Sequence, residues 1–178
     1  MATIPTIPTE APGNFWTSAL WNANILGGLN YLFAPVRFKG YSSVTQAIGT
    51  GTTAVPLTMD TEIIDSDGGH STVANTSRYV CQTAGTFYIN GSVCFATSAS
   101  GTRTLMILVN GVVVPGSMIQ TAPQGSNGGS ACTATTTQLS VGDYVEIACW
   151  QNSGGTLATS IGGSQSVNST MNLFRFSA

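Results

Sequence analysis

Charged side chains are scarce in this sequence. Asp, Glu, Lys and Arg make up 7% of the 178 residues, against about 25% in an average soluble domain. The five cations do not cluster along the chain; they are Arg37, Lys39, Arg78, Arg103 and Arg175. Proteins that bind nucleic acid neutralise phosphates with a basic stripe. We therefore expect no nucleic acid partner.

The chain also holds a single histidine, His70, and histidine is the residue type that most often exchanges protons near neutral pH. Catalysis needs a positioned acid or base and usually a nucleophile, and no Gly-x-Ser-x-Gly motif is present. A hydrolase would have to use His70 or paired carboxylates. We predict that the protein is not an enzyme.

Paired metal-binding cysteines and a secretion signal are missing too. The four cysteines are widely spaced, without a Cys-x-x-Cys pair, and are predicted to be buried thiols rather than zinc ligands or disulfides; they are Cys81, Cys94, Cys132 and Cys149. The N-terminus carries no Lys or Arg and no continuous apolar run, so no signal peptide is expected.

What the sequence does contain is apolar: 42% of residues are hydrophobic, which is enough to bury a core. Two regions differ in composition and in the spacing of their apolar residues. Residues 1–35 form a Pro-rich arm (1–13) followed by an apolar run (14–33) that predicts a helix, whereas residues 36–178 consist of short apolar or alternating runs separated by Gly, Asn and Pro. The second pattern is typical of an antiparallel β sandwich.

The helix predicted at 14–33 is apolar around most of its circumference, so it requires a partner. A membrane span is not expected, because three asparagines and two glycines interrupt the run. We assign residues 1–35 to attachment and oligomerisation, with six apolar contact residues: Trp16, Leu20, Trp21, Ile25, Leu29 and Leu32.

Within residues 36–178, "RTLMILV" (103–109) and "VVVPG" (112–116) flank Asn110-Gly111, a strong hairpin signal because both turn positions accept positive φ. In "TFYINGSVCF" (86–95), period-2 alternation places Tyr88 and Asn90 on the face opposite Phe87 and Ile89. These patterns predict a sandwich or jelly roll.

Three segments of this region resemble C1q/TNF-like jelly-roll domains: "AGTFYINGSVCF" (84–95), "LMILVNGVVV" (105–114) and "LSVGDYVEIACWQNSGG" (139–155). Residues 57–89 and 15–35 more closely resemble C1q-like modules of bacteriophage virion proteins. The fold class expected from the resemblance is all-β, a C1q/TNF-like antiparallel jelly-roll sandwich with a short N-terminal extended arm and helix. Unlike secreted C1q-like proteins, the chain has no collagen repeats.

The resemblance implies a non-enzymatic homotrimer displayed on the surface of a virion, assembled in the host cytoplasm and anchored to capsid or tail proteins through residues 1–35. It leaves open a minor tail, baseplate or fibre-tip component and a capsid decoration protein. One alternative is a receptor-binding module whose loops grip host surface glycans, and a lesser one is a secreted C1q-like binding protein. Four aromatic residues are candidates for the trimer interface, on the outer face of one sheet: Tyr88, Tyr144, Trp150 and Phe174.

The segment "DTEIIDSDGGH" (60–70) gathers four of the seven acidic residues beside His70. Asp65 and Asp67 resemble the start of a calcium loop, but Thr76 stands where an EF-hand loop needs a bidentate Glu. The other interpretation is a tight turn whose Asp side chains accept backbone N–H groups, with Arg78 as their salt-bridge partner. No cofactor is expected, and calcium at Asp65 and Asp67 stays as an alternative.

Overall fold

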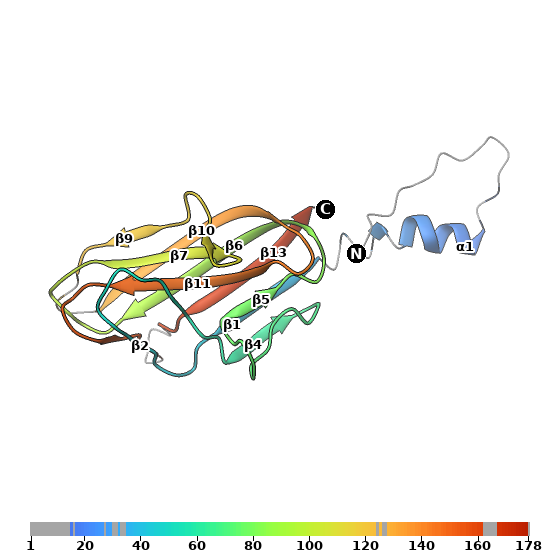
Figure 1. Ribbon diagram of the computed structural model, residues 1–178. Helices are drawn as coiled ribbons and strands as arrows, with labels where there is room; N and C mark the ends of the chain where they lie inside the picture. The colour runs from blue at the N-terminus through green and yellow to red at the C-terminus, as the bar shows by residue number, and fades with distance from the viewer. Residues whose placement is uncertain are drawn as a thin grey trace.

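The computed structural model describes residues 15, 17–26, 28–29, 32, 35–123, 125, 128–161 and 167–177. Two antiparallel sheets pack face to face, and their strands run along the long axis of the sandwich (Figure 1). The predicted all-β jelly-roll sandwich is confirmed. The arm at residues 1–13 lies outside the described residues.

The first sheet has five strands in the order β10-β6-β13-β1-β4. Its members are β1 (Arg37–Tyr41), β4 (Thr61–Asp65), β6 (Gly85–Phe95), β10 (Gly129–Leu139) and β13 (Thr170–Ser177). Each pairs antiparallel with its neighbour, and β6 and β10 stay in register along their full length. The first strand, β1, lies between β4 and the last strand, β13.

The second sheet has six strands. Four lie side by side in the order β3-β11-β7-β8; in addition, β5 pairs with β11 and β9 pairs with β7. Its members are β3 (Val55–Pro56), β5 (Arg78–Val80), β7 (Arg103–Val109), β8 (Val112–Val113), β9 (Ile119–Thr121) and β11 (Tyr144–Gln151). A small two-stranded sheet joins β2 (Ala47–Ile48) to β12 (Leu157–Ala158).

The core lies between the two sheets and is built from the inward half of each alternating strand. Phe87, Ile89 and Phe95 of β6 face Ile107 of β7 and Ile147 of β11, and all five are fully buried. Gly91 of β6 also points inward, where a Cβ would lie 2.6 Å from the Ile147 side chain. A larger residue there would push the sheets apart.

The hairpin prediction at Asn110-Gly111 is confirmed. Both residues have positive φ, 53° and 78°, as a two-residue primed turn requires, and β7 pairs with β8 directly across it. The sequence patterns missed β2, β9 and β12, because strands of two or three residues are too short to show a period of two.

Within the helix predicted at 14–33, the structure has α1 (Ser18–Trp21) and a π-helix, η1 (Asn22–Leu26), while residues 14, 16, 27, 30–31 and 33 lie outside the described residues. Thr17 caps α1, because its Oγ1 accepts a hydrogen bond from the Leu20 backbone N–H. Figure 1 shows α1 outside the sandwich, and none of its residues is buried. No helix in the described ranges has the length and apolar character needed to cross a membrane.

Candidate interaction surface

The outer face of the five-stranded sheet carries an exposed aromatic pair. Tyr88 of β6 and Phe174 of β13 stand directly opposite each other in register, flanked by Arg37 on one side and Thr136 on the other. The Tyr88 and Phe174 side chains are 45% and 42% exposed. Adjacent aromatic side chains left open to water on a sheet face are typical of an interaction surface.

Beyond the aromatic pair, the same face is polar and internally hydrogen-bonded. Asn172 Nδ2 donates to Asn90 Oδ1 at 3.2 Å, and Asn90 Nδ2 donates to the Thr133 carbonyl at 3.1 Å. In the next row, the hydroxyls of Ser92 and Thr170 lie 2.7 Å apart. A flat face with paired polar groups beside aromatic residues can be covered by another protein at small desolvation cost.

The N-terminal segment meets the aromatic end of this face. Leu32 and Pro35 line a small depression of about 120 Å³ together with Phe174, Arg175 and Phe176. Leu32 is 70% exposed, and Phe176 is exposed as well. The apolar surface is therefore continuous from the sheet face to the chain that enters the sandwich.

A second exposed apolar surface lies along the outer edge of the six-stranded sheet, on β8 and on the segment that leads into β9. Its members are Val112, Val113, Met118 and Ile119. β8 and β9 both pair with β7, and among the described residues β8 pairs with no other strand. A free strand edge with apolar side chains invites a partner.

The four aromatic residues predicted for one trimer-forming face lie on two sheets, which corrects that prediction. Tyr88 and Phe174 are neighbours, but Tyr144 and Trp150 belong to β11 of the other sheet. Alternation reveals which residues share a face of one strand; it does not reveal which strands share a sheet.

Both aromatic residues of β11 have contacts within the chain. The Arg78 guanidinium lies 4.2 Å from the centre of the Tyr144 ring. Trp150 packs on a small outer cluster formed by Met106, Leu108 and Ala148. Their part in a trimer stays a prediction.

The predicted attachment residues lie within the N-terminal segment, residues 15–35. Trp21, Leu29 and Leu32 are exposed, while Leu20 and Ile25 are half-buried; Trp16 lies outside the described residues. The prediction omitted Phe15 and Leu26, which are also exposed. Both are apolar members of the same run, so the run as a whole was the better signal.

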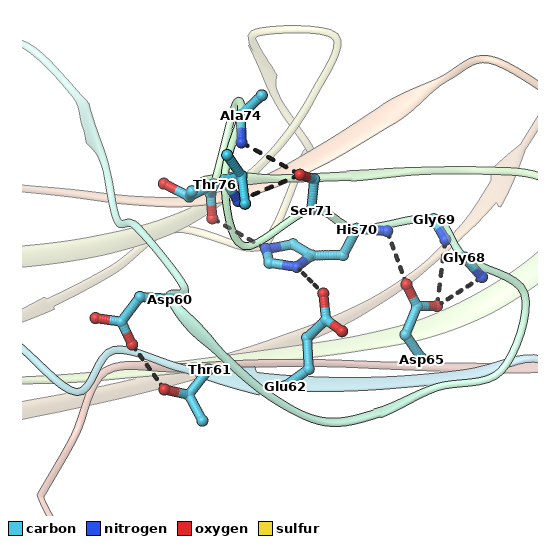
Figure 2. A network of polar contacts seen from close by, with 11 residues as sticks. Asp60, Thr61, Glu62, Asp65, Gly68, Gly69, His70, Ser71, Ala74 and Thr76 are labelled. Atoms are coloured by element: carbon cyan, nitrogen blue, oxygen red, sulfur yellow. Dashed lines mark hydrogen bonds and ion pairs between the residues drawn. The ribbon is translucent and has the colours of Figure 1, made fainter.

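In the acidic segment 60–70, Asp65 closes a turn of its own. Its carboxylate accepts hydrogen bonds from the backbone N–H groups of Gly68, Gly69 and His70 at 3.1, 3.2 and 2.9 Å (Figure 2). Gly68 has a φ of 68°, which a glycine adopts without strain. This is the capped turn that was one of the two interpretations of the segment.

His70 anchors the loop to the sheet. Its Nδ1 lies 2.7 Å from Glu62 Oε1 and its Nε2 lies 3.1 Å from the Thr76 carbonyl oxygen (Figure 2). The ring packs on Phe38 with 4.8 Å between ring centres, and the side chain is fully buried. Both ring nitrogens are engaged in structural contacts, so the arrangement is that of an anchor for the loop.

The remaining acidic groups point to separate partners. Asp67 accepts a hydrogen bond from the Tyr79 hydroxyl at 2.9 Å, and Asp60 accepts from the Ser43 backbone N–H at 2.8 Å. Burial raises the pKa of the Asp67 carboxyl, and the bond from Tyr79 offsets only part of this effect. Within the described ranges, no three His, Cys, Asp or Glu side chains converge as metal ligands. A calcium ion at Asp65 and Asp67 would have to compete with these hydrogen bonds.

Arg78 does not pair with the acidic segment, contrary to the prediction. Its Nε donates to Glu146 Oε1 at 3.0 Å, and the Ser77 hydroxyl donates to the same oxygen at 2.7 Å. Arg78 and Glu146 stand opposite each other on β5 and β11. The cross-strand neighbour Glu146 takes the Arg78 Nε–H donor, and the Asp65 carboxylate in the acidic loop is instead satisfied by backbone N–H groups.

All four cysteines are free thiols. Three are buried as predicted, but Cys132 is exposed on the outer face of β10. Burial raises the pKa of Cys149 to about 12 and also raises the pKa of Cys81. These two thiols are protonated at neutral pH and so are poor nucleophiles.

No family profile and no curated protein matches the sequence. Solved structures do resemble this one. The globular domain of zebrafish complement 1qA superposes with a TM-score of 0.56 at 14% identity, covering 80% of this chain and 99% of that one. Murine APRIL at pH 5.0 gives 0.60 at 9% identity with the same coverages, and Eiger TNF from S. frugiperda gives 0.54 at 12%, covering 80% and 91%.

At these identities the likeness defines the fold. The chain has the C1q/TNF-like jelly-roll fold, as the sequence resemblance led us to expect.

Proposed function

We propose that the protein is a non-enzymatic homotrimer displayed on the surface of a bacteriophage virion and attached through residues 1–35. The observation that supports the trimer most directly is the exposed aromatic pair of Tyr88 and Phe174 on a sheet face whose neighbouring polar groups are already hydrogen-bonded. Each side chain is already more than half buried, so covering the rest favours association by about half of the 1.5–3 kcal/mol of a fully buried side chain, or roughly 1.5–3 kcal/mol for the pair in each copy.

The two exposed apolar surfaces differ. If the sheet face of one copy contacts the β8–β9 edge of the next, the copies form a ring. The sheet face presents Tyr88 and Phe174, whereas the β8–β9 edge presents Val112, Val113 and Ile119. A contact between unlike surfaces runs head to tail and closes into a ring when the rotation between copies allows it. The resemblance to C1q-like modules is the reason for proposing three copies in the ring.

The attachment role rests on the N-terminal segment. Trp21 is 52% exposed, and Leu26, Leu29 and Leu32 are exposed as well. So much exposed apolar surface in a short segment requires a partner. The virion itself is proposed from the resemblance of residues 15–35 and 57–89 to phage modules, either on the tail or as a capsid decoration.

The oligomeric state is tested by sedimentation equilibrium of the full chain at micromolar concentration. A mass of three chains is the expected result. A monomer in the presence of the N-terminal segment would overturn the trimer.

The location is tested separately, with a labelled antibody against residues 36–178 and electron microscopy of virions from the source phage. Label on the capsid or on the tail distinguishes the two sites. Absence of label from purified virions would overturn the virion role without touching the trimer.

A further inference from the structure

A shallow pocket lies between the loop that follows β4 and the start of β11. Its volume is about 340 Å³, and its lining includes His70, Ser71, Asn75, Arg78, Gln82 and Tyr144. The volume falls at the lower end of the range of about 300–1,000 Å³ typical of small-molecule sites. Polar and apolar atoms both line the pocket, and none of its residues belongs to the sheet face proposed for the trimer.

Arg78 is held rigidly in this pocket. Its Nε donates to Glu146, whose side chain is 5% exposed, and its Cζ lies 4.2 Å from the centre of the Tyr144 ring. Two fixed contacts remove most of the rotamer freedom of a long side chain, so little entropy is lost when a ligand binds.

The outer end of the guanidinium is open. An arginine has five N–H donors; Nε accounts for one, and the four on Nη1 and Nη2 donate to no residue in the described ranges. The Arg78 side chain is 38% exposed. A pair of parallel N–H donors that faces solvent matches the two oxygens of a carboxylate.

Amide and hydroxyl side chains line the same pocket. The Asn75 side chain and the Tyr144 hydroxyl make no hydrogen bond to the described part of the chain, and Gln82 uses only its Nε2, which donates to the Val80 carbonyl. These groups offer donors and acceptors together, which suits the hydroxyl groups of a sugar, since each hydroxyl both donates and accepts.

We propose that this pocket binds an acidic monosaccharide unit of a glycan, with the sugar carboxylate on Arg78 and ring hydroxyls on Asn75, Gln82 and Tyr144. The proposal gives a site to the glycan-binding alternative and does not depend on the virion role. In a trimer, three such pockets would act together, and multivalency raises avidity by about 10²–10⁴.

The test is saturation-transfer NMR on the full chain with glucuronate, galacturonate and N-acetylneuraminate as probes. Glucose and galactose are the neutral controls, and acetate is the control for a bare carboxylate. We expect saturable binding of at least one acidic sugar, with transfer to ring protons, and weaker binding of its neutral counterpart and of acetate. Since free sugars are used, a monomer and a trimer give the same answer, so a failed trimer and a failed pocket are distinguishable.

Three variants locate the site. Arg78→Lys keeps a cation for Glu146 but loses the planar donor pair, and we expect affinity to fall by about tenfold or more, the equivalent of one charge-assisted hydrogen bond. Asn75→Gly preserves the positive φ of 51° and removes the amide, and Gln82→Ala removes a second one; each should weaken binding severalfold. Arg37→Lys makes the same exchange as Arg78→Lys at an exposed position of β1 on the other sheet and should bind normally.

Four outcomes overturn the proposal: no acidic sugar binds at millimolar concentration, neutral sugars bind equally well, acetate binds as tightly as the sugar, or Arg78→Lys binds like the wild type. If Arg78→Lys fails to fold, Asn75→Gly and Gln82→Ala decide, and unchanged binding in both overturns it.

Discussion

The outer faces of the two sheets both carry apolar side chains, but only on the six-stranded sheet are these side chains buried by other residues of the same chain. On the six-stranded sheet, Met106, Leu108 and Ala148 point outward and are nevertheless buried, packed with Trp150 and Ala54. On the five-stranded sheet, Tyr88 and Phe174 point outward and nearly half of each side chain meets water.

The difference separates stability from assembly. A side chain covered by its own chain contributes to folding of the single chain, whereas an exposed aromatic pair contributes only when another molecule covers it. Substitutions on the two faces should therefore act on different measurements, and four changes test this from the largest effect to the smallest.

The largest effect is expected from Phe174→Asp. An aspartate at this position loses its hydration when the face is covered, and the cross-strand neighbour Arg37 offsets only part of that cost, so about 3 kcal/mol of association free energy is lost. We expect the trimer to dissociate at micromolar concentration, measured by sedimentation equilibrium, while the folded monomer keeps its circular dichroism spectrum.

Val73→Asp is the matched control for Phe174→Asp, because Val73 is exposed on a loop and belongs to neither apolar surface. It should leave the trimer intact. If Phe174→Asp sediments like the wild type, the five-stranded face is not the interface.

The reverse pattern is expected from Met106→Ala on the six-stranded sheet. Removing a buried methionine side chain leaves a cavity and costs about 2 kcal/mol or slightly more. Denaturant unfolding should report this loss of stability, and sedimentation should still report a trimer. A dissociated Met106→Ala protein would show that both faces serve assembly.

Asp65→Ala tests whether lowering the stability of the five-stranded sheet is enough to dissociate the trimer when the exposed aromatic face is left unchanged. Asp65 ends β4 and accepts three backbone N–H groups, so its loss should cost about 1–2 kcal/mol without dissociating the trimer. Melting temperatures of the wild type with calcium and with chelator complete the test. A rise with calcium that Asp65→Ala abolishes would mean that the loop is a metal site.

The smallest effect is expected from Asp143→Ala, in the turn before β11. Asp143 accepts from Asn110 Nδ2 at 2.8 Å and from the Ser140 N–H at 2.7 Å, and these bonds lower the pKa of its carboxyl. A lowered carboxyl pKa stabilises the fold above the unfolded pKa, and this contribution disappears as the pH falls through the folded pKa.

Asp143→Ala should therefore cost about 0.5–1 kcal/mol at neutral pH, and the gap from the wild type should narrow progressively as the pH falls below about 4, near the pKa of an aspartate in the unfolded chain. Unfolding curves between pH 3 and 7 check this. A gap that persists at low pH would mean that the ionised carboxylate is not the stabilising group.

The sequence allowed the local structure to be predicted where one strand or one turn carries the signal. Asn110-Gly111 specifies its hairpin by φ alone, and the alternation in β6 separates Tyr88 from Phe87 without any knowledge of the partner strand. β11 behaves differently: Val145 to Cys149 are buried on both faces, so alternation there says nothing about which side meets the core.

Contacts between distant strands could not be predicted. Arg78 and Glu146 form an ion pair because β5 and β11 are neighbours. The sequence of neither strand indicates that the other is its partner. The same reason places Tyr88 beside Phe174 and leaves Tyr144 on the opposite sheet. The pocket around Arg78 was also missed, since it combines residues of the 68–82 segment with Tyr144.

The position of β1 between β4 and β13 has a consequence for the order of events during synthesis. One edge of β1 has no hydrogen-bond partner until β13 emerges from the ribosome, because the two strands pair along Arg37–Tyr41. Pairing between strands so far apart is slow and comes late. In the proposed trimer, the apolar N-terminal segment would therefore be available to meet sister chains before the sandwich closes, so that assembly would begin during translation.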